Sequence, residues 1–139
     1  MTLPPQTIGL FFTVALLAVT AYFLLGSVPL LVLKHDNPVD ASFIRSFYIT
    51  YYRIALITAV PTAVCYALAG RTVLALGAGG IAALTLLLRA RFIPMMDQLA
   101  PQIQAKEALA VPAFRQLHKS AILINTGQLL AILGSLSLL

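Results

Sequence analysis

The stretch IGLFFTVALLAVTAYFLLGSVPLLVL, residues 8–33, contains no charged side chain. Crossing about 30 Å of hydrocarbon takes about 20 apolar residues in an α-helix, so this stretch is long enough to span a membrane. A cleavable signal peptide would begin with a basic segment and have a shorter apolar core, and this stretch has neither property. We therefore interpret it as a retained transmembrane helix.

The rest of the chain repeats this pattern. Three more apolar stretches follow within the 139 residues, at 54–69, 73–88 and 121–139. The chain is 60% hydrophobic and 9% charged, whereas soluble domains contain about 25% charged residues. Cys65 is the single cysteine, which excludes a scaffold of internal disulfides. The sequence predicts an all-α fold, an integral membrane four-helix bundle of one domain, 1–139, with spans at about 8–33, 48–69, 72–90 and 115–138.

The connections between the predicted spans differ in length. Gly70 and Arg71 join the second and third spans, which predicts an antiparallel helical hairpin with a very short turn. The connection after the third span is the longest and contains Pro94, Pro101 and Pro112. We expect an interfacial segment at about 95–111 with a short helix beginning near Pro101, and a last helix opened by Pro112, because proline suits the first turn of a helix.

The second helix is expected to begin before its apolar run. Asp40 follows Pro38 and is a suitable N-cap. Five aromatic side chains follow at helical spacings: Phe43, Phe47, Tyr48, Tyr51 and Tyr52. Amphipathic aromatic rings favour the membrane–water interface, so this end of the helix is expected there. Pro61 lacks an N–H and is expected to kink the helix near its middle.

Basic residues gather on one side of the predicted topology. With four spans, the loops after the first and third spans share a side, and eight of the nine Lys and Arg residues lie in or beside them: Lys34, Arg45, Arg53, Arg89, Arg91, Lys106, Arg115 and Lys119. The positive-inside rule therefore predicts both termini on the non-cytoplasmic side of a multi-pass protein in the inner (plasma) membrane. This distribution accounts for the net charge of +5 without a nucleic-acid partner.

The last span carries polar side chains along one helical face. Arg115, His118, Asn125 and Gln128 recur at steps of three and seven residues. Polar groups within a span are costly and are functional candidates by default. Two interpretations stay open. The amides hydrogen-bond a neighbouring helix and hold the bundle together, or His118 and Asn125 act in catalysis while Arg115 and Gln128 bind a ligand.

A second candidate face lies on the second helix. Tyr51 and Thr58 are expected to turn their hydroxyls toward the polar face of the last span and to bind the same ligand, although threonine in a membrane helix often bonds its own backbone instead. Arg53 has two interpretations. It extends to the cytoplasmic headgroups, or it turns inward, where it would hold an anionic or quinone-like ligand or pair with Asp36, Asp40 or Asp97.

Residue spacing indicates neither a metal site nor a particular cofactor. His35 and His118 would have to meet to hold a haem, and the sequence lacks a His-x-x-x-His, a Glu-x-x-His and a cysteine pair. It also lacks a glycine-rich phosphate loop and a Gly-x-Ser-x-Gly motif. We expect no metal site, and the sequence leaves any cofactor unidentified.

Small residues recur at helical spacing in the last two spans. Ala75, Gly79 and Ala83 form a small-xxx-small row in the third span, and Ser120, Gly127 and Gly134 give the fourth a similar flat face. Such rows allow two helix backbones to approach closely. They are predicted to be packing surfaces, within the monomer or between copies.

Three segments of the chain resemble a family of small membrane proteins. They are FRQLHKS at 114–120 with Asn125, FIRSFYITYYR at 43–53, and RFIPMMDQL at 91–99. Through them the chain, from residue 26 onward, resembles small four-helix integral membrane proteins of unknown function related to the anthrone-oxygenase-like family. The resemblance implies that His118 is a general acid or base and that Asn125 and Arg53 position an aromatic, phenol-like substrate.

Two functions are consistent with these features. The first is a membrane oxygenase or oxidoreductase that binds a lipophilic aromatic or quinone-like molecule among its helices. The second is a non-enzymatic structural or assembly subunit, in a homo-oligomer or a larger membrane complex. In both cases the lipid bilayer is a partner, and the sequence alone does not decide whether the chain is an enzyme.

The predicted orientation can be tested with single cysteines. In a Cys65→Ala background, Glu107→Cys is expected to react with a membrane-impermeant maleimide only when the inner membrane face is exposed, because its loop is cytoplasmic. Thr72→Cys, beside the opposite turn, is the matched control and is expected to react from the outer face. The reverse labelling pattern would place the termini in the cytoplasm.

Overall fold

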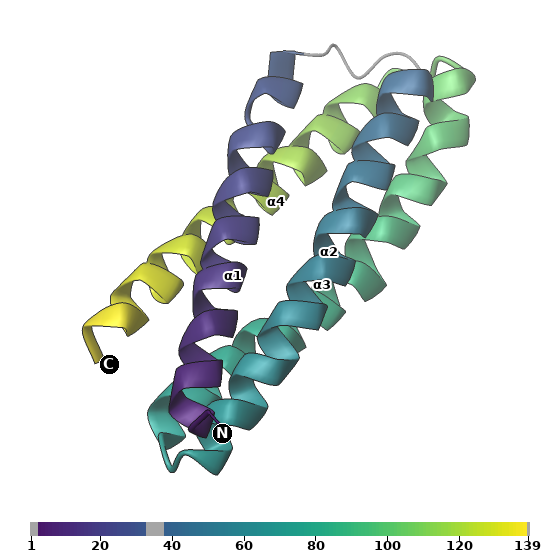
Figure 1. Ribbon diagram of the computed structural model, residues 1–139. Helices are drawn as coiled ribbons and strands as arrows, with labels where there is room; N and C mark the ends of the chain where they lie inside the picture. The colour runs from purple at the N-terminus through teal and green to yellow at the C-terminus, as the bar shows by residue number, and fades with distance from the viewer. Residues whose placement is uncertain (1–2, 33–37, 139) are drawn as a thin grey trace.

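The computed structural model describes residues 3–32 and 38–138, and this part of the chain consists of helices joined by short turns, with no strand. Four long helices make up the fold: α1 (Pro5–Ser27), α2 (Pro38–Leu68), α3 (Thr72–Gln104) and α4 (Ala110–Ser135). Short 3-10 turns follow the first and last of them, η1 (Pro29–Val32) and η2 (Leu136–Leu138). Figure 1 shows the four helices side by side as one elongated bundle. Each is long and apolar enough to cross a membrane, as the sequence predicted.

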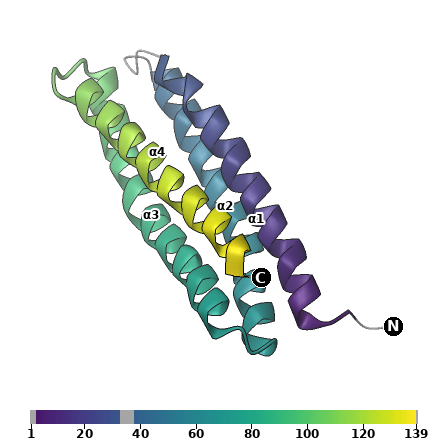
Figure 2. The ribbon, with the colours of Figure 1, turned by 90° about the vertical axis from the view of Figure 1, so that its left-hand side faces the viewer.

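The helices α2 and α3 form the expected hairpin. Only residues 69–71 separate them, and Gly70 adopts a positive φ of 73° there, which glycine alone adopts without strain. Arg71 closes the turn by donating its backbone N–H to the carbonyl oxygen of Tyr66 at 2.9 Å. Helix α1 packs along α2, and α4 lies between α1 and α3 (Figure 2).

The helix α3 is longer than predicted. It continues through Pro94 and Pro101 to Gln104, so the separate interfacial helix expected within 95–111 does not form, and residues 105–109 make the connection to α4. The cause is tertiary packing, since Ile93, Met96 and Ile103 are buried on one face of α3 in the same cluster as the first half of α2. This packing outweighs the hydrogen bonds that the prolines remove.

The starts of α2 and α4 also differ from the predictions. Helix α2 begins at Pro38, so Asp40 lies inside the first turn and is not the N-cap. Its carboxylate is still well placed there, near the positive end of the helix dipole. Helix α4 begins at Ala110, two residues before Pro112, and α2 stays helical through Pro61.

Polar and small residues occupy the buried face of α1. The buried positions are Gly9, Thr13, Leu16, Thr20, Phe23 and Ser27, at alternating steps of four and three. Large apolar side chains occupy the opposite faces of the bundle, for example Phe11, Leu25, Ile57, Leu76 and Leu123. The molecule therefore has a partly polar interior and an apolar surface, an arrangement suited to hydrocarbon surroundings.

Gly9 lets α1 pack closely against α2. A Cβ at this position would lie 3.1 Å from Cε1 of Tyr66 and 3.3 Å from Cβ of Cys65, so Gly9→Leu is expected to overpack the interface and lower stability by about 1–3 kcal/mol. Gly79→Leu is the matched control, because nothing lies within 4 Å of its added Cβ. Thermal unfolding in detergent measures both variants. Equal melting temperatures would contradict the packing of α1 on α2.

Candidate functional site

His118 belongs to a hydrogen-bonded network that joins three helices and has Ser27 at its centre. Its side chain is 0% exposed, and Nε2 lies 3.1 Å from Oγ of Ser27 and 3.2 Å from the Ser27 carbonyl oxygen. A carbonyl oxygen can only accept a hydrogen bond, so the contact with the Ser27 carbonyl places the ring hydrogen of His118 on Nε2. The Ser27 hydroxyl also bonds the hydroxyl of Tyr48. Helices α1, α2 and α4 are thereby linked at one level of the bundle.

Aromatic rings surround this network of hydrogen-bonded side chains. The ring of Tyr48 meets that of His118 edge to face, with centroids 5.9 Å apart, and lies 5.8 Å from the ring of Tyr52. Tyr51 in turn packs 5.2 Å from Phe23 of α1. These rings exclude water and lipid from the polar groups among them, which strengthens each hydrogen bond.

A second polar group lies along α4 from His118. Tyr51 donates its hydroxyl hydrogen to Oδ1 of Asn125, and its oxygen also lies 3.3 Å from Oε1 of Gln128. The three side chains are nearly inaccessible, with exposed fractions of 2%, 2% and 5%. Since α4 rises 1.5 Å per residue, Asn125 lies about 10 Å from His118 along the helix axis.

Three buried polar atoms near this group have no hydrogen-bond partner in the part of the chain that the structure describes. They are the hydroxyl oxygen of Tyr52, Nδ2 of Asn125 and Nε2 of Gln128. A buried polar atom left without a partner costs about 1–3 kcal/mol. Each of the three carries hydrogen that it can donate, so a molecule with acceptor oxygens would complete the set.

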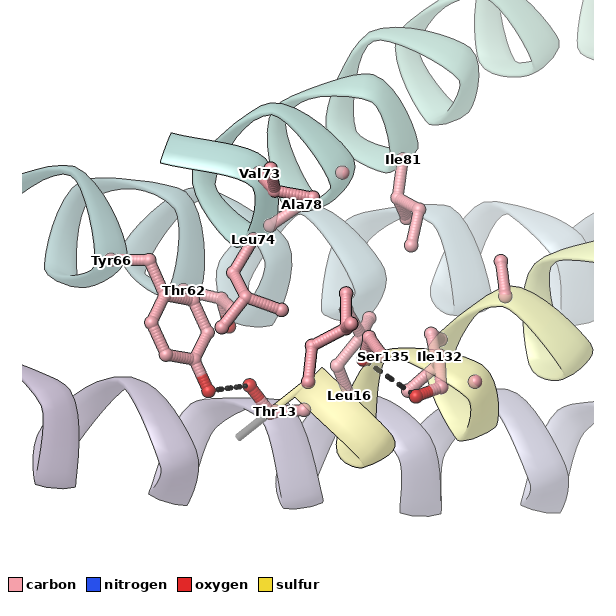
Figure 3. A pocket seen from close by; sticks show the side chains of 14 residues that line it. Thr13, Leu16, Thr62, Tyr66, Val73, Leu74, Ala78, Ile81, Ile132 and Ser135 are labelled. Atoms are coloured by element: carbon pink, nitrogen blue, oxygen red, sulfur yellow. Dashed lines mark hydrogen bonds between the residues drawn. The ribbon is translucent and has the colours of Figure 1, made fainter. Parts of the chain in front are cut away.

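A third polar contact lies nearer the α2–α3 turn. The hydroxyls of Thr13 and Tyr66 are 2.9 Å apart, and Thr13 also donates to the carbonyl oxygen of Gly9 at 2.8 Å. This pair lines a cavity of about 320 Å³ between the helices, with Leu16, Leu74 and Ile132 among its apolar walls (Figure 3).

The structure joins three of the seven predicted site residues, Tyr51, Asn125 and Gln128, by hydrogen bonds. His118, Asn125, Gln128 and Tyr51 all lie in the buried interior. Thr58 is buried, but its hydroxyl donates to the carbonyl oxygens of Ile54 and Ala55 in its own helix, each at 3.0 Å. Thr58 therefore bonds the backbone of its own helix and does not turn its hydroxyl toward α4.

The two predicted arginines lie away from the cluster. Arg53 is exposed on α2, which is the orientation suited to reaching the headgroups. Arg45, and not Arg53, pairs with Asp97 of α3. Arg115 is half-buried at the start of α4 and donates from Nη2 to the carbonyl oxygen of Leu31 at 2.8 Å. Asp36 lies outside the described residues.

Sequence reasoning missed Ser27, Tyr48 and Tyr52 as members of the site. A signal for Ser27 is present in the sequence: Thr13, Thr20 and Ser27 recur at a strict spacing of seven, which places three hydroxyls on one helical face. Tyr48 and Tyr52 were assigned to the membrane interface, yet both rings point inward and are 1% exposed.

In residues 3–32 and 38–138, no group of three or more His, Cys, Asp and Glu side chains is arranged to hold a metal ion. His35, the second histidine considered for a haem, lies outside these ranges. No protein-family model, curated protein or solved structure matches this chain.

The hydroxyl of Tyr51 supports the amides on α4. Tyr51→Phe removes the donor to both amide oxygens, so we expect a loss of about 1–3 kcal/mol of stability. Tyr22→Phe is the matched control, because Tyr22 is 70% exposed on α1, and no change is expected there. Denaturation in detergent measures both. If Tyr51→Phe is as stable as the control, the contacts to Asn125 and Gln128 do not hold α4.

Proposed function

We propose that this protein binds a lipophilic aromatic or quinone-like molecule among its helices, as a small membrane protein of oxygenase or oxidoreductase type. The observation that carries the proposal is the set of buried donors without partners at Tyr52, Asn125 and Gln128. A flat ring with carbonyl or phenolic oxygens offers acceptors to these donors. Nearby tyrosine rings offer faces against which such a ring can stack.

A groove gives such a molecule access from the side. Gln128 lines a cavity of about 320 Å³ between α3 and α4, together with Leu84, Ile124 and Gly127. This volume lies within the usual range of ligand sites, about 300–1,000 Å³. A molecule dissolved in the bilayer would enter between the two helices without passing through water.

His118 and Tyr51 take different roles in this proposal. Tyr51 touches both amides and would contact the ligand oxygens, whereas His118 lies farther from the ligand on α4 and would supply the proton of its Nε2–H through Ser27 and Tyr48. For an anthrone-like ring with dioxygen as oxidant, the ring methylene loses two hydrogens. One oxygen atom leaves with them as water, and the other becomes the ring ketone. Asn125 and Gln128 would hold the ring.

The proposal includes the location of the protein. Within the described ranges, Arg71 lies at the α2–α3 turn, and the other seven Lys and Arg residues lie between the middle of the bundle and its opposite end. This distribution supports a multi-pass protein of the inner (plasma) membrane with both termini on the non-cytoplasmic side.

The second candidate function, an assembly subunit, is favoured by a different observation. Among the described residues, no atom lies within 4 Å of the Cβ that would be added at Gly79, so there is open space beside this glycine. The row formed by Ala75, Gly79 and Ala83 would then accept a helix from a second copy or from a larger membrane complex.

Native mass spectrometry of the untagged protein in mild detergent, paired with its absorption spectrum, tests the two functions together. We expect a stoichiometric aromatic molecule on the wild-type protein and its loss in Gln128→Leu, because the substitution removes a ligand contact. Gln116→Leu is the matched control, since Gln116 is exposed on the same helix. A wild-type spectrum with lipid alone, and a mass that shows copies or partner subunits, would reject ligand binding and favour assembly.

A further inference from the structure

The groove beside Gln128 continues toward the α2–α3 turn. It shares Gly77, Ile81 and Ala131 with the cavity shown in Figure 3, so the two cavities, each of about 320 Å³, adjoin. We call the two together the α3–α4 cleft. It extends along α4 from Gln128 to Leu138, which corresponds to about 15 Å of helix.

The two ends of the cleft differ in polarity. At the far end, the hydroxyls already have partners: Thr62 donates to the Thr58 carbonyl oxygen at 2.7 Å, and Ser135 donates to that of Ile132 at 2.6 Å. Nε2 of Gln128, at the near end, has no partner among the described residues. The cleft therefore offers one polar anchor and an otherwise apolar path.

Glycines keep this path open. Gly77, Gly80, Gly127 and Gly134 line the cleft, and no atom lies within 4 Å of the Cβ that each would gain. In a bilayer such a space is filled by hydrocarbon, and lipid chains gain no hydrophobic energy by entering it, because the bilayer is equally apolar. A chain attached to a group bound at Gln128 gains instead from close van der Waals packing against the walls of the cleft.

We propose that the α3–α4 cleft binds the hydrocarbon chain of a ring-headed amphiphile whose ring lies at Gln128 and Asn125. The ligand class is thus a chain-bearing quinone or phenol, with the chain directed toward Leu138 and the α2–α3 turn. This inference rests on the proposed function, since it assumes the ring site, and it adds the specificity for the chain.

Binding of para-benzoquinones that carry a methyl, hexyl or decyl chain tests the inference. With wild-type protein in nanodiscs, affinity is expected to rise by about tenfold or more from methyl to decyl, as close packing of the chain along the cleft predicts. Gly134→Leu is expected to abolish this gain and to keep the affinity for the methyl compound, because Gly134 lines the far cavity and not the one beside Gln128, so its new side chain fills only the path of the chain.

Gly79→Leu is the matched control. At Gly79, as at Gly134, no described atom lies within 4 Å of an added Cβ. Gly79 is not among the residues that line either cavity. It is expected to keep the wild-type dependence on chain length. Comparing variants in the same nanodiscs cancels the partitioning of each quinone into lipid.

The outcomes separate the two proposals. The chain site is overturned, and the ring site left standing, if the methyl compound binds without any gain for decyl, or if the gain persists in Gly134→Leu. Failure of all three quinones to bind overturns the ring site and the chain site together. A loss of chain dependence in Gly79→Leu alone, with a change in oligomeric mass, would assign the surface to a helix of a second copy.

Discussion

The structure depends on the satisfaction of polar groups in an environment without water. In hydrocarbon, a hydroxyl or amide must find its partner inside the protein. Here Ser27 joins α1 to Tyr48 of α2 and His118 of α4, and Tyr51 joins α2 to Asn125 of α4. Apolar packing against lipid gives helices little reason to associate, so these contacts fix which faces of α1 and α4 turn inward.

The same constraint explains why the bundle is uneven. The helices α2 and α3 are held by a short turn and by a continuous apolar seam that includes Ile44, Ile93 and Met96. Helix α4 joins this seam through Phe114 and Leu117 and adds polar contacts at His118 and Asn125, whereas glycines line its cleft with α3 farther along. The part of α4 beyond Gln128 has the fewest polar contacts with other helices. It is also the part beside open volume, where a molecule from the bilayer can enter.

The sequence predicts most of the fold and about half of the site. Four apolar runs and the short turn at Gly70 are local signals, so the spans and the hairpin follow from them. The extension of α3 through Pro94 could not be predicted, because it depends on burial of Ile93 and Met96 against α2. The spacing singles out His118 and Asn125, but it leaves both interpretations of Arg53 open, since position along the chain does not give the direction of a side chain.

The central claim is that the amides of Asn125 and Gln128 are binding groups and not only structural ones. Nuclear magnetic resonance of protein labelled at asparagine and glutamine observes their side-chain N–H groups directly. The account predicts that adding decyl para-benzoquinone shifts the amide signals of Asn125 and Gln128, while that of the exposed Gln116 stays unchanged. If none of the three amide signals shifts when the quinone is added, the claim that Asn125 and Gln128 bind a ligand is contradicted.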